Sequence, residues 1–394
     1  MRLNGERYIR IYRPNIQQIK LIRAMRLCKS PALGGKVIVC KKCAHQHYIY
    51  YSCGHSHCPI CQSIKRAQWA DRLRAELYKV PYIHTTFTLP HQLNGLARAN
   101  QTKVYGLLMR VAWKTIKQVS QKEANIGALP GMIAVLHTFG SDMKYHVHVH
   151  CLITFGGLTK EGKWRYPKRK NKIARYRELC AVFRELFLRE VKRLFDKKAL
   201  CYHQSYEELS SELQSKRWVV HNTPPTMDTK VLESYLAKYI NRVAISNSRL
   251  TYLHEQHKVN IIYNDYKNQQ AGCPAPKTLK TLDPLVAIDQ IMQHVLPPYF
   301  QKSRRYGLHA PATKRRLENV IPDKIKRNGQ TVRTLLQILT QLLKVKPFEC
   351  SNCQSTEYII QEVKKDKSWI QQYIAIPNCR PPPNLSCILT PTLK

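Results

Sequence analysis

The stretch that most restricts the fold of this chain is residues 146–153, which read HVHVHCLI. Histidines and apolar residues alternate there with a period of two, which predicts a β-strand. One face carries histidines and the other carries apolar residues directed into a core: His146, His148 and His150 against Val147, Val149 and Cys151. The apolar segment 133–139, followed by turn-forming Gly140, Ser141 and Asp142, is expected to pair with this strand as a hairpin.

The three histidines on one strand face form a candidate metal site. Neutral imidazole is a common metal ligand, and ring nitrogens two residues apart on a strand can reach one divalent ion. The alternative is a polar sheet face that is rich in histidine and binds no ion. The histidine strand alone leaves both interpretations open.

Cysteine spacing predicts a zinc site near the N-terminus. Two CxxC pairs, Cys40 with Cys43 and Cys58 with Cys61, are separated by 14 residues, a spacing typical of tetrahedral zinc. We expect these four thiolates to bind one structural Zn²⁺, with Cys53 as an alternative ligand. Cys28 and Cys53 are also candidates for a second ion.

A third CxxC pair lies close to the C-terminal end of the sequence, at Cys350 and Cys353. Cys379 and Cys387 are candidates to complete a second zinc site with this pair. A flexible, proline-rich tail is the alternative interpretation of the same residues.

The charge of the chain predicts a polyanionic partner. Lysine and arginine number 65 against 25 acidic residues, a formal net charge of +40, which favours nucleic acid. No apolar run approaches the length of a membrane span, and residues 1–13 lack the apolar core of a signal peptide. We therefore expect no membrane partner and a cytoplasmic location, nucleoid-associated when bound to DNA, where the 14 cysteines serve metal rather than disulfides.

Basic residues that could contact phosphates occur in several short groups along the chain. The alternative for each group is a solvated surface, which is the usual role of a charge run. The candidate DNA-binding residues are Lys65, Arg66, Lys168, Arg169, Lys170, Arg304, Arg305, Lys314, Arg315 and Arg316.

The remaining pattern predicts an α+β fold with helices packed on an antiparallel sheet. Residues 82–90 alternate as a strand, and residues 93–121 have helical periodicity. Helical periodicity also covers residues 230–243, where Tyr235 and Tyr239 lie one turn apart on an apolar stripe. Aromatic residues on such a stripe are usually core, so the residues themselves give these tyrosines no catalytic role.

In their order, these motifs resemble the rolling-circle insertion-sequence transposases with two catalytic tyrosines. That family belongs to the HUH endonuclease superfamily, named for its histidine–hydrophobic–histidine strand. The resemblance covers about residues 25–350 and rests on the Cys40–Cys43 pair and six further motifs: SCGHSHCPIC (52–61), FTLP (87–90), LHTFGSDMKYHVHVH (136–150), GGL (156–158), YLAKYINRVAIS (235–246) and RRYGLHA (304–310).

The resemblance implies roles for individual residues. His148 and His150 match the superfamily motif and would hold a catalytic Mg²⁺ or Mn²⁺, and the cysteine pairs match an N-terminal zinc-binding domain. Tyr235 and Tyr239 match the two nucleophiles. The superfamily uses a third polar ligand, which the sequence does not identify; the candidates are, in order, Asp142, His146 and His84.

The resemblance also implies a domain order. It predicts an N-terminal zinc-binding domain with a basic helix at 1–78 and an HUH catalytic domain at 79–265, with a basic helical insertion near 160–225. A basic, mixed DNA-binding region at 266–346 and a tail at 347–394 follow.

The implied activity is nicking and rejoining of single-stranded DNA through a 5′-phosphotyrosine intermediate. The implied partners are single-stranded or hairpin ends of the mobile element, a target site, and host replication proteins as further candidates. Two alternatives remain at this point: a replication initiator or relaxase of the same superfamily, and a zinc protein that binds DNA without catalysis.

Overall fold

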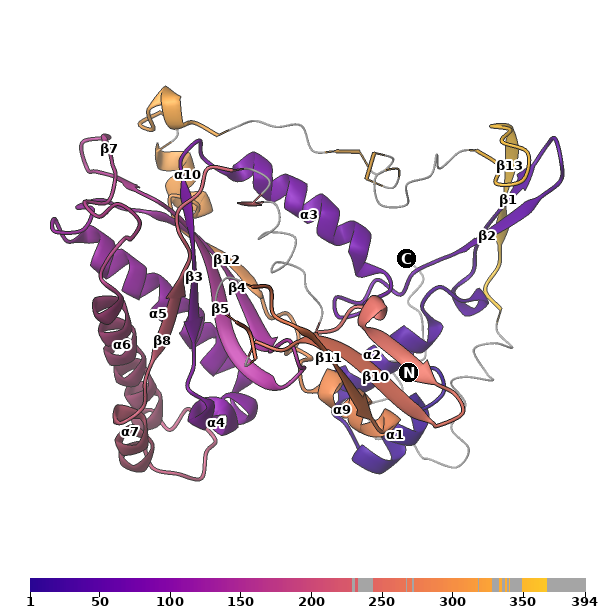
Figure 1. The fold of residues 1–394 in the computed structure, drawn as a ribbon, viewed down its shortest axis with the longest axis horizontal. Coiled ribbons are helices and arrows are strands. Elements are labelled where there is room, and N and C mark those ends of the chain that lie inside the picture. The colour runs from indigo at the N-terminus through magenta and orange to yellow at the C-terminus, as the bar shows by residue number, and fades with distance from the viewer. Residues whose placement is uncertain are drawn as a thin grey trace. The chain divides into compact units, whose positions relative to one another are not determined.

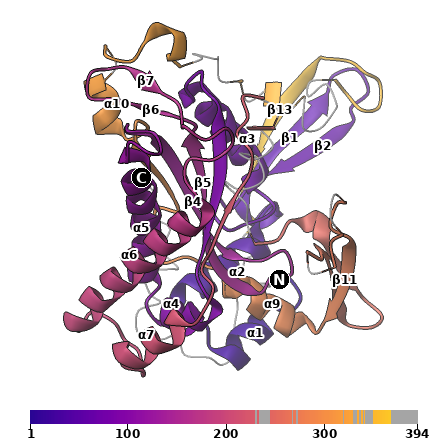
Figure 2. The same cartoon turned by 60° about the vertical axis from the view of Figure 1, so that its left-hand side comes forward.

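The chain divides into two compact units, described separately below (Figures 1 and 2). The first comprises Met1–Cys61 and Phe348–Lys394, and the second comprises Gln62–Pro347. The chain therefore leaves the first unit once and returns to it at the end. The computed structural model describes residues 1–228, 231–232, 244–266, 268–270, 273–317, 319–327, 333–334, 337–338, 340 and 349–366.

The first unit begins with two helices, α1 (Gly5–Tyr12) and α2 (Ile16–Leu27). Asn15 starts α2 with a capping box, because its side chain accepts the backbone N–H groups of Gln17 and Gln18, while the Gln18 side chain accepts the Asn15 N–H. A short 3₁₀ turn follows at Pro31–Leu33. A three-stranded antiparallel sheet completes the unit, in the order β13 (Tyr358–Val363), β1 (Gly35–Cys40) and β2 (Gln46–Tyr50).

Strand β13 places part of the predicted tail of residues 347–394 in the first unit. It pairs with β1 along its whole length, from Gly35 opposite Val363 to Cys40 opposite Tyr358, and appears beside β1 in Figure 1. The sequence alone predicts residues 358–363 as part of a tail. Paired strands can lie far apart in sequence. The local pattern of residues 358–363 therefore does not identify β1 as the strand that pairs with β13.

The second unit is built on a five-stranded antiparallel sheet in the order β12-β4-β5-β3-β8. The strands predicted at 82–90, 133–139 and 146–153 are its three central members, so the expected α+β fold is confirmed. The five strands are β3 (Tyr82–Thr88), β4 (Gly131–Phe139), β5 (Tyr145–Thr154), β8 (Val219–Asn222) and β12 (Ser303–Gly307).

One face of this sheet is covered by helices that form the main core (Figure 2). Val147, Val149 and Cys151 are fully buried there, as their alternation predicts. The apolar stripe predicted for residues 93–121 also faces this core. The helices are α4 (Asn94–Ala99), α5 (Gln101–Gln121), α6 (Tyr176–Asp196) and α7 (Tyr206–Gln214).

Helix α3 (Gln62–Glu76) contributes to a smaller core on the opposite sheet face. Its Leu73 is buried together with Ile133, Val135 and Leu152, which alternate with the residues of the main core. At the sheet edge, Arg305 of β12 donates two hydrogen bonds to the Glu76 carboxylate, at 2.6 and 2.9 Å. This pair ties α3 to the edge strand.

These contacts disagree with two predicted domain boundaries, the one at residue 78 and the one at residue 266. Helix α3 belongs to the second unit rather than to a domain of residues 1–78. Strand β12 completes the main sheet, so residues 266–346 are not a separate region. The predicted helical insertion near 160–225 contains α6 and α7 and ends in β8, which pairs with β3 and so belongs to the main sheet.

The other elements of the second unit are short. A second antiparallel sheet has the order β11-β10-β9. Among the described residues, no helix is both long and apolar enough to span a bilayer. The remaining elements are β6 (Gly157–Leu158), β7 (Trp164–Arg165), β9 (Leu250–Leu253), β10 (Lys258–Asn264), β11 (Lys277–Leu282), α9 (Pro284–Met292), α10 (Pro311–Leu317) and the 3₁₀ turns His91–Leu93, Asn247–Arg249 and Asp323–Ile325.

Candidate active site and metal centres

Three imidazoles meet on the sheet face opposite the main core. His148 and His150 lie on β5, and His137 lies on β4 directly opposite His148. One ring nitrogen of each residue lies within 4.8 Å of the others. Antiparallel pairing and the two-residue period of the strands produce this cluster, because they place alternate residues of two neighbouring strands on one face.

The hydrogen bond made by His148 fixes its tautomer. Its Nδ1 lies 2.9 Å from the backbone oxygen of His146. A carbonyl can only accept, so Nδ1 carries the proton and donates, and Nε2 carries the lone pair that a metal requires. The Nε2 atoms of His148 and His150 are 3.1 Å apart. Two nitrogens bound at right angles about 2.1 Å from one ion are about 3.0 Å apart, so the pair fits a common cation.

His150 is held from the neighbouring strand β3. Its Nδ1 lies 3.0 Å from His84 Nε2 and 3.1 Å from Thr86 Oγ1. Burial, together with the nearby His221, lowers the pKa of His84 to about 4, so the His84 ring is neutral at neutral pH. These contacts orient the His150 ring through Nδ1 and direct Nε2 toward His148, as outer partners of metal-binding histidines do.

The structure brings together His148 and His150 as predicted, but neither of the first two candidates for the third ligand joins them. Asp142 lies in the turn before β5, where its Oδ1 accepts the Lys144 N–H at 3.2 Å. His146 is exposed, with its ring 5.0 Å from that of His148. His84, the third candidate, contacts His150 from outside the cluster.

The third imidazole is His137, which the sequence reasoning missed. The turn register alone would not have found it: next to the turn Phe139 pairs with Tyr145, and a register shift between His137 and Phe139 is what places His137 opposite His148. The LHTF segment was treated only as an apolar partner strand, so its one histidine was overlooked.

Tyr235 and Tyr239 lie outside the described residues. The described residues nearest to them on the N-terminal side are Val231 and Leu232, which are helical. The Leu232 N–H donates to the Asp228 carbonyl at 3.0 Å, and its side chain is buried in the core that contains Val135. Val135 is paired with His150, so Leu232 packs on the histidine-bearing face of the sheet.

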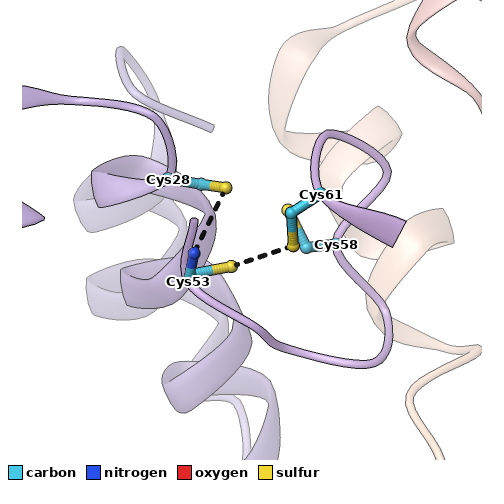
Figure 3. Close-up of side chains that lie close together, drawn as sticks. All are labelled: Cys28, Cys53, Cys58 and Cys61. Atoms are coloured by element: carbon cyan, nitrogen blue, oxygen red, sulfur yellow. Dashed lines mark hydrogen bonds between the residues drawn. The ribbon is translucent and has the colours of Figure 1, made fainter. Parts of the chain in front are cut away.

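Four cysteines in the first unit converge on one point (Figure 3). The sulfurs of Cys53 and Cys61 are 3.7 Å apart, and the Cys53 N–H donates to the Cys28 sulfur at 3.5 Å. Sulfurs bound tetrahedrally at about 2.3 Å from zinc are about 3.8 Å apart. The cluster, formed by Cys28, Cys53, Cys58 and Cys61, therefore fits Zn²⁺. The hydrogen bond between Cys58 and Cys53 lowers the pKa of Cys58 to about 5, which favours the thiolate form that zinc requires.

A second group of four sulfurs lies at the other end of the β1–β2 hairpin. It joins Cys40 and Cys43 to Cys350 and Cys353, with sulfurs 3.5 Å apart between Cys40 and Cys353 and 3.6 Å apart between Cys43 and Cys350. The backbone N–H of His45 lowers the pKa of Cys43 to about 6.

The predicted single site of Cys40, Cys43, Cys58 and Cys61 is therefore wrong in its pairing. Cys40 and Cys43 flank the turn of the hairpin, whereas Cys28 and Cys53 lie next to its open end. A six-residue strand spans about 17–20 Å, too far for the two pairs to share an ion. The alternative ligand Cys53 belongs to the first cluster, as does Cys28, and Cys379 and Cys387 lie outside the described residues.

The predicted DNA-binding residues occupy different local settings. Lys65, Lys168, Lys170, Arg315 and Arg316 are exposed. Lys314 and Arg304 are partly buried, and the Arg304 guanidinium lies 5.4 Å from the centre of the Phe300 ring. Arg169 donates to Asn125 Oδ1 at 2.9 Å, and Arg305 is engaged by Glu76. The side chain of Arg66 lies outside the described residues.

Two family descriptions match the chain. "Transposase zinc-binding domain" matches residues 1–89, and "Putative transposase" matches residues 131–316. The chain is 33% identical over 299 residues to "Putative transposase y4qJ" of Sinorhizobium fredii, covering 74% of each chain. It is 25% identical over 350 residues to the transposase for insertion sequence element IS801 of Pseudomonas savastanoi pv. phaseolicola, covering 85% of this chain and 82% of that protein.

Solved structures give a more distant likeness. The metal-bound conjugative relaxase TrwC in complex with oriT DNA is 13% identical, with a TM-score of 0.23 over 40% of this chain and 70% of that chain. A copper-bound structure of the same relaxase with oriT DNA gives 13% identity and a TM-score of 0.22, over 39% of this chain and 67% of that chain.

Proposed function

This chain belongs to the IS91/IS801-type family of transposases, and from that premise we propose that it nicks and rejoins single-stranded DNA through a 5′-phosphotyrosine link. The observation that carries this proposal is the cluster of His137, His148 and His150 on the two central strands β4 and β5. Three convergent imidazoles can hold a divalent cation beside a scissile phosphate. A cation bound there would polarise the phosphate and neutralise charge that develops on its oxygens.

Tyr235 and Tyr239 are the proposed nucleophiles. The phenolic oxygen of one tyrosine bonds to phosphorus and loses its proton, while the bond from phosphorus to the 3′ oxygen breaks and that oxygen gains a proton. The products are a 5′-phosphotyrosine and a 3′-hydroxyl. Attack by a new 3′-hydroxyl on the phosphotyrosine reverses the step and joins a different strand.

Leu232 supports a position for the tyrosines near the imidazoles. It is buried on the histidine-bearing sheet face, and the sequence pattern predicts that one helix carries Leu232, Tyr235 and Tyr239. Residues three and four apart on a helix share a face. A tyrosine pair one turn apart allows a second transfer while the first strand is still covalently held.

The three imidazole nitrogens of the cluster influence which cation binds most tightly. Mg²⁺ prefers oxygen ligands, whereas imidazole suits the transition metals better. Of the two ions expected from the family resemblance, three neutral imidazoles favour Mn²⁺. We expect Mn²⁺ to bind the metal-free protein at least about 10-fold more tightly than Mg²⁺ in titration calorimetry. Equal affinity for the two ions, or Mn²⁺ binding that survives His148→Ala, would contradict this assignment.

In the first unit, Cys28, Cys53, Cys58 and Cys61 are the proposed ligands of a structural Zn²⁺. The spacing of their sulfurs supports this role, as does the match of residues 1–89 to a transposase zinc-binding domain. All four coordination positions would be filled by protein, which is the arrangement of structural rather than catalytic zinc.

The activity is tested with single-stranded oligonucleotides that carry the ends of the encoding element. With Mn²⁺, the protein should nick one specific position and remain attached to the 5′ side of the cut, visible as a slower band in a denaturing gel. A zinc protein that binds DNA without catalysis would shift the oligonucleotide in a native gel and leave it intact.

DNA binding should depend steeply on salt, because the chain carries a net charge of +40. If about five phosphates are neutralised on single-stranded DNA, affinity should fall about 100-fold between 50 and 200 mM salt. Replacing Lys314, Arg315 and Arg316 of α10 by alanine should reduce the log–log slope by about 2. Fluorescence anisotropy measures both effects.

A matched control is the double variant Arg189→Ala/Lys192→Ala on α6. Its two side chains pair with Glu185 and Asp196 one turn away, so their charge is compensated locally and the slope should stay unchanged. An affinity for DNA that does not change with salt would reject the electrostatic account.

A further inference from the structure

We propose that Cys40, Cys43, Cys350 and Cys353 bind a second structural zinc ion that joins the two ends of the first unit. The zinc-binding family description covers residues 1–89 and so includes only half of these ligands. The other half comes from beyond residue 347, where the chain returns to the first unit. The inference is independent of the nicking chemistry.

The sulfurs are spaced for a tetrahedral ion. Cys40 and Cys353 are 3.5 Å apart, Cys43 and Cys350 are 3.6 Å apart, and all four sulfurs lie within 4.8 Å of one another. Tetrahedral zinc thiolate sites place sulfurs about 3.8 Å apart, whereas a disulfide bond is about 2.05 Å long. The group therefore has the dimensions of a metal site and not of two disulfides.

The two cysteine turns have the same backbone geometry. In each, the N–H of the residue after the second cysteine donates to the carbonyl of the first cysteine at 2.9 Å, from Ala44 to Cys40 and from Gln354 to Cys350. Ala44 and Gln354 both adopt a left-handed conformation, with φ of 56° and 59°. Such values are uncommon outside glycine, and their recurrence in two unrelated sequences indicates a shared requirement to present two sulfurs from one tight turn.

A second hydrogen bond repeats as well. The Cys40 N–H donates to the His45 carbonyl at 3.0 Å, and the Cys350 N–H donates to the Ser355 carbonyl at 2.9 Å. In both turns, the N–H of the first cysteine thus bonds to the carbonyl of the residue five positions later.

Strand pairing brings the two turns together. The six residues of β13 pair with β1 in continuous register, and the Lys41 N–H donates to the Glu357 carbonyl at 3.0 Å just beyond the paired residues. The Ser351 hydroxyl lies 3.3 Å from His45 Nε2, which links the turns directly. Gly35 permits close packing on the other side of β1, because a Cβ there would lie 2.4 Å from the Ile49 carbonyl oxygen.

The small sheet needs such a link, because it buries little apolar surface. Ile359, Ile360, Tyr48 and Ile49 are all exposed, with relative exposures between 42% and 53%. Small units without a sufficient core depend on metals or disulfides for stability. Zn²⁺ with four thiolates carries a net charge of −2, and the exposed Lys41 and Lys42 within the first turn compensate it.

The experiment counts zinc in the full-length protein by mass spectrometry of the metal. Every protein tested also carries His148→Ala, because the imidazole cluster would otherwise add a third ion. This parent protein should contain two zinc ions per chain, and adding Cys350→Ser/Cys353→Ser should leave one. The control Cys201→Ser/Cys273→Ser removes two exposed cysteines outside both clusters and should keep two ions. Cys379→Ser/Cys387→Ser should also keep two ions.

Cobalt substitution tests the site without removing it. The His148→Ala parent protein should take up two Co²⁺ with the absorption of tetrahedral thiolate sites. Cys353→His should still bind two Co²⁺, with sulfur-to-metal absorption reduced by about one thiolate in eight. The shifted spectrum would assign Cys353 to the site even if the serine double variant does not fold.

Three results would overturn the proposal. They are one zinc ion in the His148→Ala parent, two after adding Cys350→Ser/Cys353→Ser, and loss of the second ion after adding Cys379→Ser/Cys387→Ser. If wild-type protein fails to nick DNA while the parent holds two zinc ions, only the proposed function is rejected.

Discussion

Replacing Tyr235 and Tyr239 together by phenylalanine is expected to lower formation of the covalent DNA adduct by about 10⁴-fold or more. Phenylalanine keeps the ring and its packing but removes the oxygen that would bond to phosphorus. DNA affinity and thermal stability should stay close to wild type. The adduct is measured with a labelled single-stranded oligonucleotide in a denaturing gel.

The two single variants need not behave alike, because one tyrosine can start the reaction and the other finish it. Tyr252→Phe on β9 is a matched control that removes a hydroxyl elsewhere in the second unit, next to His257, and it should form the adduct normally. If the double variant still forms the adduct at wild-type yield, the nucleophiles lie elsewhere and the two rings belong to the core.

Removing an imidazole from the cluster is expected to reduce nicking about 100-fold or more, the usual scale for losing a group that stabilises transition-state charge. His148→Ala tests the residue expected from sequence, and His137→Ala tests the ligand found from strand pairing. His146→Ala is the control, because it changes the same strand at an exposed position outside the cluster. Nicking rates at saturating Mn²⁺ and the Mn²⁺ affinity should be measured together.

His84→Ala separates a supporting role from direct binding. Since His84 contacts Nδ1 of His150, its loss should weaken Mn²⁺ binding about 10- to 100-fold, the scale of a lost outer partner. Excess Mn²⁺ should then restore most of the nicking activity. If His137→Ala nicks DNA like the wild type while His84→Ala is inactive, the third ligand has been assigned to the wrong histidine.

Local patterns were sufficient to predict the central strands of the sheet. Alternation along residues 146–153 fixed both the strand and the faces of His148 and Val149, because side-chain direction in a strand follows directly from its period. His137 needed one further step, the register of a hairpin. The turn sets the pair Phe139–Tyr145, but a bulge between His137 and Phe139 then shifts the register by one residue, and the local sequence does not predict that bulge.

Other features depend on pairings that local sequence does not encode. The CxxC spacing identified zinc ligands, but which pair meets which is decided by the sheet that carries them. Cys40 and Cys353 are 313 positions apart, and only the pairing of β1 with β13 makes them neighbours. The assignment of Tyr235 and Tyr239 rested on family resemblance, because an apolar helix stripe with tyrosines is indistinguishable from core by residue type.

The discontinuity of the first unit sets an order of events during synthesis. At about 5–20 residues per second, about 15–60 s separate the translation of Cys40 from that of Cys353. During that interval β1 has no partner on one edge, and two of the four cysteines of the second cluster are already made. A ribosome that stops between residues 347 and 358 would release a chain whose whole second unit has been made but whose first unit lacks strand β13. A first unit with both cysteine clusters complete would therefore mark a chain that has been translated past its whole second unit.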